Sequence, residues 1–151
     1  MIFNTKPLEA SGRILLGGTP DGVDALALSE VAVLADGVHL HIARDDRRMD
    51  QLRNVLGVFA PGLDVLSFPA WDCLPYDRVS PNAEISATRM NTLARLVGQP
   101  PPKGPAIVLT TVNASLQRLP PRRSIEGAAF QAGIGAVVEV AALLEFLVRN
   151  G

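Results

Sequence analysis

The chain has 151 residues, of which 48% are hydrophobic and 19% charged, with a formal net charge of -1 and an isoelectric point near 6.1. This composition is typical of a globular domain, and no uncharged run approaches the length of a membrane-spanning helix. The near-neutral charge argues against a dedicated nucleic-acid-binding protein, and the single cysteine excludes an internal disulfide or a multi-cysteine metal site. The N-terminus has no secretion signal, so we expect a cytoplasmic protein.

Strands and helices alternate along the first half of the chain. An apolar run at residues 14–16 predicts a buried strand, and apolar residues at helical spacing follow over residues 23–34. Thr19 and Pro20 are typical of a helix start, and the spacing places Leu26 and Leu34 on the apolar face. A strand at 38–43, a helix over 45–59 with Phe59 on its apolar face, and a strand at 63–68 are predicted next.

The second half continues the alternation and then changes character. An irregular loop at residues 69–81 precedes a helix over 82–97 that buries Met90 and Leu93, and a proline cluster at 98–105 ends this helix. The continuous apolar run at 106–112 predicts a buried strand. We therefore expect an α/β fold with a parallel sheet and helices on both faces. After a boundary near residue 123, a short strand and turn at 124–135 and an almost wholly apolar helix at 137–150 are predicted.

A glycine-rich loop lies between the first predicted strand and helix. Gly17 and Gly22 are spaced as in the phosphate-binding pattern G-x-x-x-x-G-K-[ST], but Val23 and Asp24 replace its lysine and hydroxyl residues. Carboxylates at this point would repel a phosphate. The sequence predicts a degenerate phosphate loop that binds no nucleotide, comprising Gly17, Gly18, Gly22, Val23 and Asp24. A simple strand-to-helix turn that needs small residues is the structural alternative.

Two histidines and the cysteine are weaker candidates for chemistry. His39 and His41 alternate on a strand and would share a face, as an H-x-H metal pair does, but no third ligand is evident and a polar strand face explains them equally well. Cys73 has no histidine near it in sequence, and the flanking WDCLP indicates packing rather than catalysis. We therefore predict no metal site and no catalytic residue.

Three arginines form the last candidate site. Arg118, Arg122 and Arg123 lie close together in sequence around two prolines, where they could contact a phosphate or a carboxylate. A solvated turn between two domains accounts for them without any partner. A nucleic-acid or interdomain contact here is expected to be weak.

The segment 68–96 carries a specific pattern, F-P-x-W-[DE]-x-L-P-Y-[DE]-x-x-S-P, followed by a helix with S-x-R-x-x-x-L. It resembles the signature near the N-terminus of the bacterial transcription-repair coupling factors, the Mfd family. The residues that carry the resemblance are Phe68, Pro69, Trp71, Asp72, Leu74, Pro75, Tyr76, Asp77, Ser80, Pro81, Ser86, Arg89 and Leu93. Residues 107–121 are similar to the strand and helix that follow, and residues 9–151 can be laid along the family without large gaps.

The resemblance implies a UvrB-like module at the start of a longer protein. Residues 1–123 would form its first lobe, a sheet of the P-loop NTPase or RecA/helicase type with a decayed phosphate loop. Residues 124–151 would begin the inserted domain that binds UvrA, which is then incomplete. The aromatic hairpin with which UvrB grips DNA is absent, because residues 69–81 form only a short loop.

The implied role is a non-catalytic scaffold. In full length the family displaces stalled RNA polymerase at DNA lesions and recruits UvrA, and ATP and Mg²⁺ are bound by motor domains beyond residue 151. We therefore expect no cofactor here, and contacts with UvrA and RNA polymerase mainly through absent regions. The apolar helix at 137–150, left uncovered, is expected either to fold back on its own lobe or to pair with the same helix of a second copy. The alternative is a free-standing α/β small-molecule-binding protein or enzyme that uses the 69–81 loop.

Overall fold

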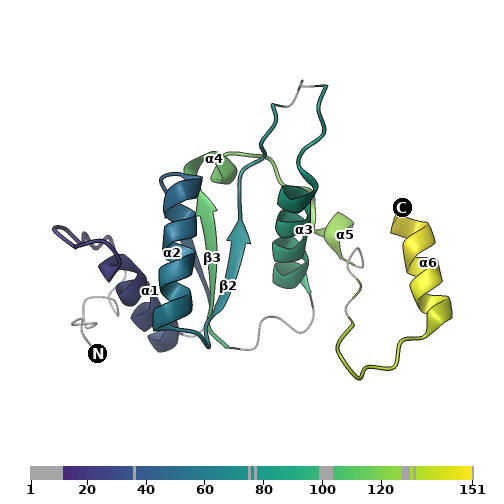
Figure 1. The fold of residues 1–151 in the computed structure, drawn as a ribbon, viewed down its shortest axis with the longest axis horizontal. Helices are drawn as coiled ribbons and strands as arrows, with labels where there is room; N and C mark the ends of the chain where they lie inside the picture. The colour runs from purple at the N-terminus through teal and green to yellow at the C-terminus, as the bar shows by residue number, and fades with distance from the viewer. Residues whose placement is uncertain are drawn as a thin grey trace.

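The computed structural model describes residues 12–35, 37–74, 76, 78–98, 104–126, 130 and 132–150. Its centre is a parallel sheet of three strands in the order β1-β3-β2 (Figure 1), formed by β1 (Val38–Ala43), β2 (Asp64–Phe68) and β3 (Ala106–Thr111). In register, Val108 of β3 lies between Leu40 of β1 and Leu66 of β2. All six residues of β3 are buried. The continuous apolar run therefore forms the central strand, as expected for a strand covered on both faces.

Helices cover both faces of the sheet. Alternate residues of β3 point to opposite sides, so Ile107 packs with Leu52 in one core and Val108 packs with Leu93 in the other. The first core lies under α1 (Val23–Leu34) and α2 (Asp46–Phe59), and the second under α3 (Ala83–Val97) and the short α5 (Arg122–Ile125). A single turn, α4 (Val112–Ser115), follows β3. The predicted α/β class, with a parallel sheet and two helical layers, is confirmed.

The last helix, α6 (Val140–Asn150), lies beside these layers rather than on the sheet (Figure 1). Phe146 packs against Phe130 with 5.6 Å between the ring centroids. Val140, Leu144 and Val148 on α6 are exposed. The helix begins three residues later than predicted, and its association with a second copy stays a prediction. Among the helices of the described residues, none is long and apolar enough to cross a membrane.

Two strand predictions and one helix start are wrong. Residues 13–17 form no strand, and Leu15 is 84% exposed, because no neighbouring strand in the described chain offers it backbone hydrogen bonds. The first helix begins at Val23 behind Gly22, whose φ of 90° is left-handed, and not at Thr19 and Pro20. Residues 122–125 are helical, so Ser124 and Ile125 do not start a strand. Ile125 packs in the core under α3, while the proposed boundary near residue 123 stays a prediction.

The predicted apolar faces are partly wrong as well. On α1 the fully buried residues are Ala25 and Ala32, whereas Leu34 is half exposed. Small side chains occupy this face because α1 packs directly against α2. Phe59 and Met90 were expected in the core but are 54% and 41% exposed. A sheet of three strands is too narrow to cover the whole apolar stripe of the helices on it.

Candidate functional site

The degenerate phosphate loop is neutralised by an arginine from the neighbouring helix. Arg48 of α2 donates from Nη2 to Oδ2 of Asp24 at 2.6 Å, and its Nη1 lies 3.6 Å from Oδ1 of Asp21. Asp24 also accepts a hydrogen bond from the backbone N–H of Ala25 in the first turn of α1. Protein carboxylates therefore already occupy the positive end of the helix, and the nearby cation is already paired. A bound phosphate would have to displace both interactions.

The rest of this loop, residues 17–23, adds no cationic side chain that could hold a phosphate. Gly17 and Gly18 lie in exposed irregular chain, and Val23 is half buried at the start of α1. Gly22 supplies the left-handed turn that lets the helix begin, a purely conformational role. The described part of the loop thus has the glycine spacing of the motif, but it lacks the motif's cation and no strand precedes it in the described chain.

The two histidines lie on the face of the sheet below α1 and α2. His41 is half buried close to Asp24 and Arg48. Burial lowers the pKa of His41; the Asp24 carboxylate opposes this shift and the Arg48 guanidinium adds to it. His39 forms a hydrogen bond through Nε2 with the carbonyl oxygen of Ala35 at 2.6 Å. In the described ranges no three His, Cys, Asp or Glu side chains are grouped as metal ligands.

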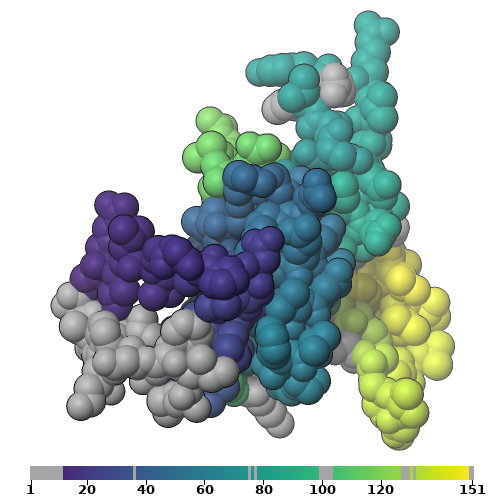
Figure 2. Space-filling view, turned by 60° about the vertical axis from the view of Figure 1, so that its left-hand side comes forward, coloured from purple at the N-terminus to yellow at the C-terminus, as the bar shows by residue number. Residues whose placement is uncertain are grey.

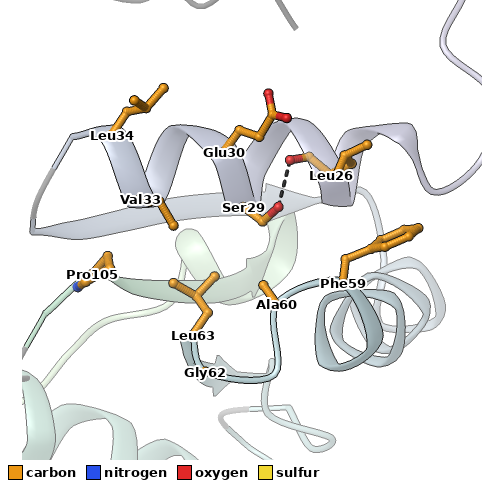
Figure 3. A pocket seen from close by; sticks show the side chains of 10 residues that line it. All are labelled: Leu26, Ser29, Glu30, Val33, Leu34, Phe59, Ala60, Gly62, Leu63 and Pro105. Atoms are coloured by element: carbon orange, nitrogen blue, oxygen red, sulfur yellow. Dashed lines mark hydrogen bonds between the residues drawn. The ribbon is translucent and has the colours of Figure 1, made fainter. Parts of the chain in front are cut away.

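A shallow apolar groove of about 490 Å³ lies between α1 and the turn that follows α2 (Figure 3). Val33 from α1 and Leu63 from the turn point toward one another across it, and Pro105 closes one end. Leu63 and Pro105 directly precede β2 and β3, so the groove lies at the amino ends of the strands. Ligands of open α/β sheets bind at the carboxyl ends. The groove is therefore not the nucleotide position of such a fold.

The family-signature segment is held at the opposite edge of the sheet by a buried arginine. Arg89 of α3 is 2% exposed, and its guanidinium lies 4.0 Å from the ring centroid of Phe68 and 4.3 Å from that of Trp71. Its Nη1 donates to the carbonyl oxygen of Pro69 at 2.5 Å and to Oε1 of Gln117 at 3.0 Å. Burial lowers the pKa of Arg89 from its usual value. The side chain joins the end of β2 to the segment after β3.

Both ends of the 69–81 loop are tied down by further hydrogen bonds. The backbone N–H of Trp71 donates to Oε1 of Gln117 at 3.1 Å, and that of Asn82 donates to Oδ1 of Asp72 at 3.1 Å. Asn82 in turn accepts from the backbone N–H of Glu84 and caps α3. These contacts fix where the loop leaves and rejoins the sheet.

The tip of the loop is different. It projects beyond the body of the molecule in both views (Figures 1 and 2). Tyr76 is 97% exposed, and the side chains of Leu74 and Val79 are 70% and 72% exposed. Pro75 and Asp77 of the signature lie outside the described residues, and Ser80 is exposed. The signature therefore combines an anchored base with an exposed apolar tip.

A cleft of about 820 Å³ lies between this loop and the residues that follow α4. Trp71, Cys73 and Tyr76 line one side, and Gln117 and Arg118 line the other. Cys73 thus lies in a cleft at the carboxyl edge of the sheet, while the histidines lie on β1.

The three candidate arginines do not share one role. Arg118 lines the cleft, Arg122 donates to Oε1 of Glu126 at 2.9 Å, and Arg123 is exposed. Sequence reasoning missed Arg48 and Gln117, because nothing in the local sequence indicates that they reach across to another element.

The comparisons with known proteins agree on one family. The chain is 33% identical over 120 residues to the transcription-repair-coupling factor of Haemophilus influenzae, and the matched region covers 80% of the chain and 10% of that relative. It is 29% identical over 123 residues to the protein of that name from Escherichia coli, covering 82% of the chain and 10% of the relative. The protein of the same name from Mycobacterium tuberculosis is 31% identical over 118 residues, covering 70% of the chain and 9% of the relative. The chain thus spans about a tenth of the length of these relatives. No family model and no solved structure matches.

Proposed function

Because the chain belongs to the transcription-repair coupling factor family, we propose that it serves as a non-catalytic scaffold segment of a longer protein that joins transcription to DNA repair. Its first lobe would be a UvrB-like, P-loop-derived sheet, and residues 124–151 would begin the UvrA-binding insert. ATP and Mg²⁺ would be bound by motor domains elsewhere in such a protein, which displaces stalled RNA polymerase at lesions and recruits UvrA.

The observation that carries this proposal is the ion-paired group formed by Arg48, Asp24 and Asp21 at the start of α1. A nucleotide-binding loop presents free N–H groups and a free cation to the phosphates. Here Asp24 pairs with the cation and lies in the first turn of the helix, so an incoming polyphosphate would meet two carboxylates. The geometry supports a role in which this edge of the lobe stabilises structure and performs no phosphoryl transfer.

Calorimetric titration of the chain with Mg-ATP tests the proposal. We expect no measurable heat of binding, because Val23 offers no charge and Asp21 and Asp24 offer the wrong one. Micromolar affinity that is lost in Gly22→Arg would overturn it. Gly57→Arg is the matched control, since Gly57 is an exposed glycine of α2 whose Cβ position is open.

A second experiment addresses the partners. We expect this chain to bind purified UvrA weakly or not at all in a pull-down, because the resemblance places most of the UvrA-binding insert beyond residue 151. The reference is a longer member of the family that contains the whole insert. Equal retention of both proteins would show that the first lobe itself carries the contact.

A further inference from the structure

The exposed tip of the 69–81 loop has no structural reason to be apolar. Exposed loop tips usually carry small and polar residues, whereas this tip carries the large, mainly apolar side chains of Tyr76 and Val79, which are 97% and 72% exposed. The base of the same loop is fixed through Arg89 and Gln117. A rigid base and an uncovered apolar tip together favour a surface that binds something.

The cleft beside the tip contains a polar group of fixed orientation. Oε1 of Gln117 accepts hydrogen bonds from Arg89 at 3.0 Å and from the backbone N–H of Trp71 at 3.1 Å. Two donors identify this atom as the amide oxygen, so the NH₂ group of Gln117 must point elsewhere. Both side-chain hydrogen bonds of Gln117 to described residues are made by Oε1, so its NH₂ group is left to donate to a ligand in the cleft that Gln117 lines. It is a preorganised donor.

The charge of the cleft is one-sided. Among the described residues that line the cleft, Arg118 is the one that carries a full charge. Its side chain is exposed and forms no ion pair with any described residue. The other walls are mainly apolar and include Trp71, Val79 and Leu116. One guanidinium and one amide donor beside apolar walls match an apolar group that carries a carboxylate next to it.

We propose that the cleft lined by Trp71, Cys73, Tyr76, Val79, Gln117 and Arg118 is a docking site for a peptide segment of a protein partner, one that presents an aliphatic or aromatic side chain beside a carboxylate. A nucleic-acid strand fits less well, because tracking a phosphate backbone needs several cations and this cleft has one among its described residues. The docking cleft is separate from the Arg48 ion pairs and does not depend on their role.

Selection from a displayed library of random peptides, with Arg118→Glu as the counter-selected protein, tests this site directly. We expect the enriched peptides to place a large apolar residue within a few positions of Asp or Glu. Trp71 is the single tryptophan of the chain and lines the cleft, so titration of an enriched peptide without tryptophan should change its fluorescence saturably.

The variants make the result specific. Arg118→Ala should weaken binding of the enriched peptide about tenfold, since a hydrogen bond to a charged group is lost, and Tyr76→Ser should weaken it several-fold. Arg123→Ala, an exposed arginine that does not line the cleft, should bind as the parent does. Thermal melts of all three should match the parent, because the substituted side chains are exposed.

Three outcomes would overturn the site. The first is no enrichment over Arg118→Glu, and the second is enriched peptides whose binding ignores both Arg118→Ala and Tyr76→Ser. The third is salt-sensitive binding of an oligodeoxythymidine that needs both Arg118 and Tyr76 and is tighter than that of any enriched peptide, which would assign the cleft to a nucleic acid instead.

Discussion

Two loops of the molecule, the one before α1 and the one after β2, differ in how their polar groups are paired. The loop before α1 has the glycine spacing of a nucleotide site, and its charges are satisfied within the protein by Arg48. The 69–81 loop has no catalytic motif. Its base is held by Nη1 of Arg89, although the buried Nε of the same side chain has no hydrogen-bond partner among the described residues, and its tip and the adjacent Arg118 are exposed. The loop before α1, which has the motif spacing, therefore has its charges paired within the protein. The 69–81 loop, which has no motif, lies beside an arginine that has no partner among the described residues.

The comparison contrasts a loop whose charges are paired within the protein with one beside an arginine that has no partner among the described residues. Asp24 uses both its oxygens on protein donors, whereas Arg118 has no described partner. Buried polar groups must be paired, and a partner already paired is costly to displace. The substitutions below distinguish side chains whose interactions stabilise the fold from exposed side chains that are free to contact a partner.

The largest effect is expected at the base of the 69–81 loop. Arg89→Ala would leave a cavity between Phe68 and Trp71 and remove the donor to the Pro69 carbonyl. We expect the free energy of unfolding to fall by about 3 kcal/mol, the sum of a cavity and an unpaired buried acceptor. Urea unfolding followed by Trp71 fluorescence and by circular dichroism measures it.

Arg89→Lys serves as the control for charge alone. It keeps the cation but loses the planar stack between two aromatic rings and the geometry that serves two acceptors. It should therefore recover only part of the loss. Full recovery by lysine, or a loss below about 1 kcal/mol in Arg89→Ala, would show that the stack does not anchor the loop.

A smaller effect is expected from Arg48→Ala at the start of α1. The ion pair with Asp24 is only partly buried, with side chains 27% and 32% exposed, so solvent screens it in part. We expect a loss of about 1 kcal/mol in unfolding free energy, mainly because Asp24 loses a charged partner. Arg47→Ala on the same helix is the matched control. Equal stability of both variants would mean that the neutralised loop contributes nothing to the fold.

The fold was largely predictable from sequence because its strongest signals are local. The run at 106–111 combines apolar and β-branched residues without a charge or a turn residue, and it forms the central strand. On α2, Met49, Leu52 and Leu56 recur at helical spacing, and all three are buried in the core. Residues 14–16 show the limit of this approach, since an apolar run forms a strand only where another strand offers it hydrogen bonds.

The site was less predictable because its contacts span long distances in sequence. Asp24 and Arg48 were both visible as charges, but their pairing depends on how α1 packs on α2. Gln117 is an ordinary residue until the fold brings it to Arg89, 28 positions away. The resemblance identified Arg89 and Trp71 as signature residues without indicating that one stacks on the other.

His41 gives the neutralised loop a dependence on pH. Its pKa in the folded state is lowered, first by burial, so the unfolded chain binds a proton more readily. The contribution that neutral His41 makes to the free energy of unfolding is therefore present above the unfolded pKa of about 6.5. It is lost as the pH falls through that value toward the folded pKa. Urea unfolding of the parent and of His41→Gln should show a steeper decline for the parent.

The pH range must exclude other titrating groups. Asp45 caps α2 and has its pKa lowered, chiefly by the hydrogen bond from the backbone N–H of Arg48, so its stabilising contribution is lost only in more acidic solution. Measurements above about pH 5 therefore leave Asp45 ionised, and the comparison with His41→Gln separates His41 from the other histidine of the chain. The prediction fails if the parent and His41→Gln lose stability in parallel between about pH 7.5 and pH 5.

The smallest effect on folding is expected at the tip of the 69–81 loop. Tyr76 is 97% exposed, so Tyr76→Ser removes almost no buried surface and should change the unfolding free energy by no more than about 0.5 kcal/mol. Trp71→Ala, at the anchored base, removes the ring that covers Arg89 and should cost several times more. Thermal unfolding by circular dichroism compares the two without relying on tryptophan fluorescence. If Tyr76→Ser destabilised the chain as much as Trp71→Ala, the tip would be part of the folded core, and its apolar residues would need no partner to explain them.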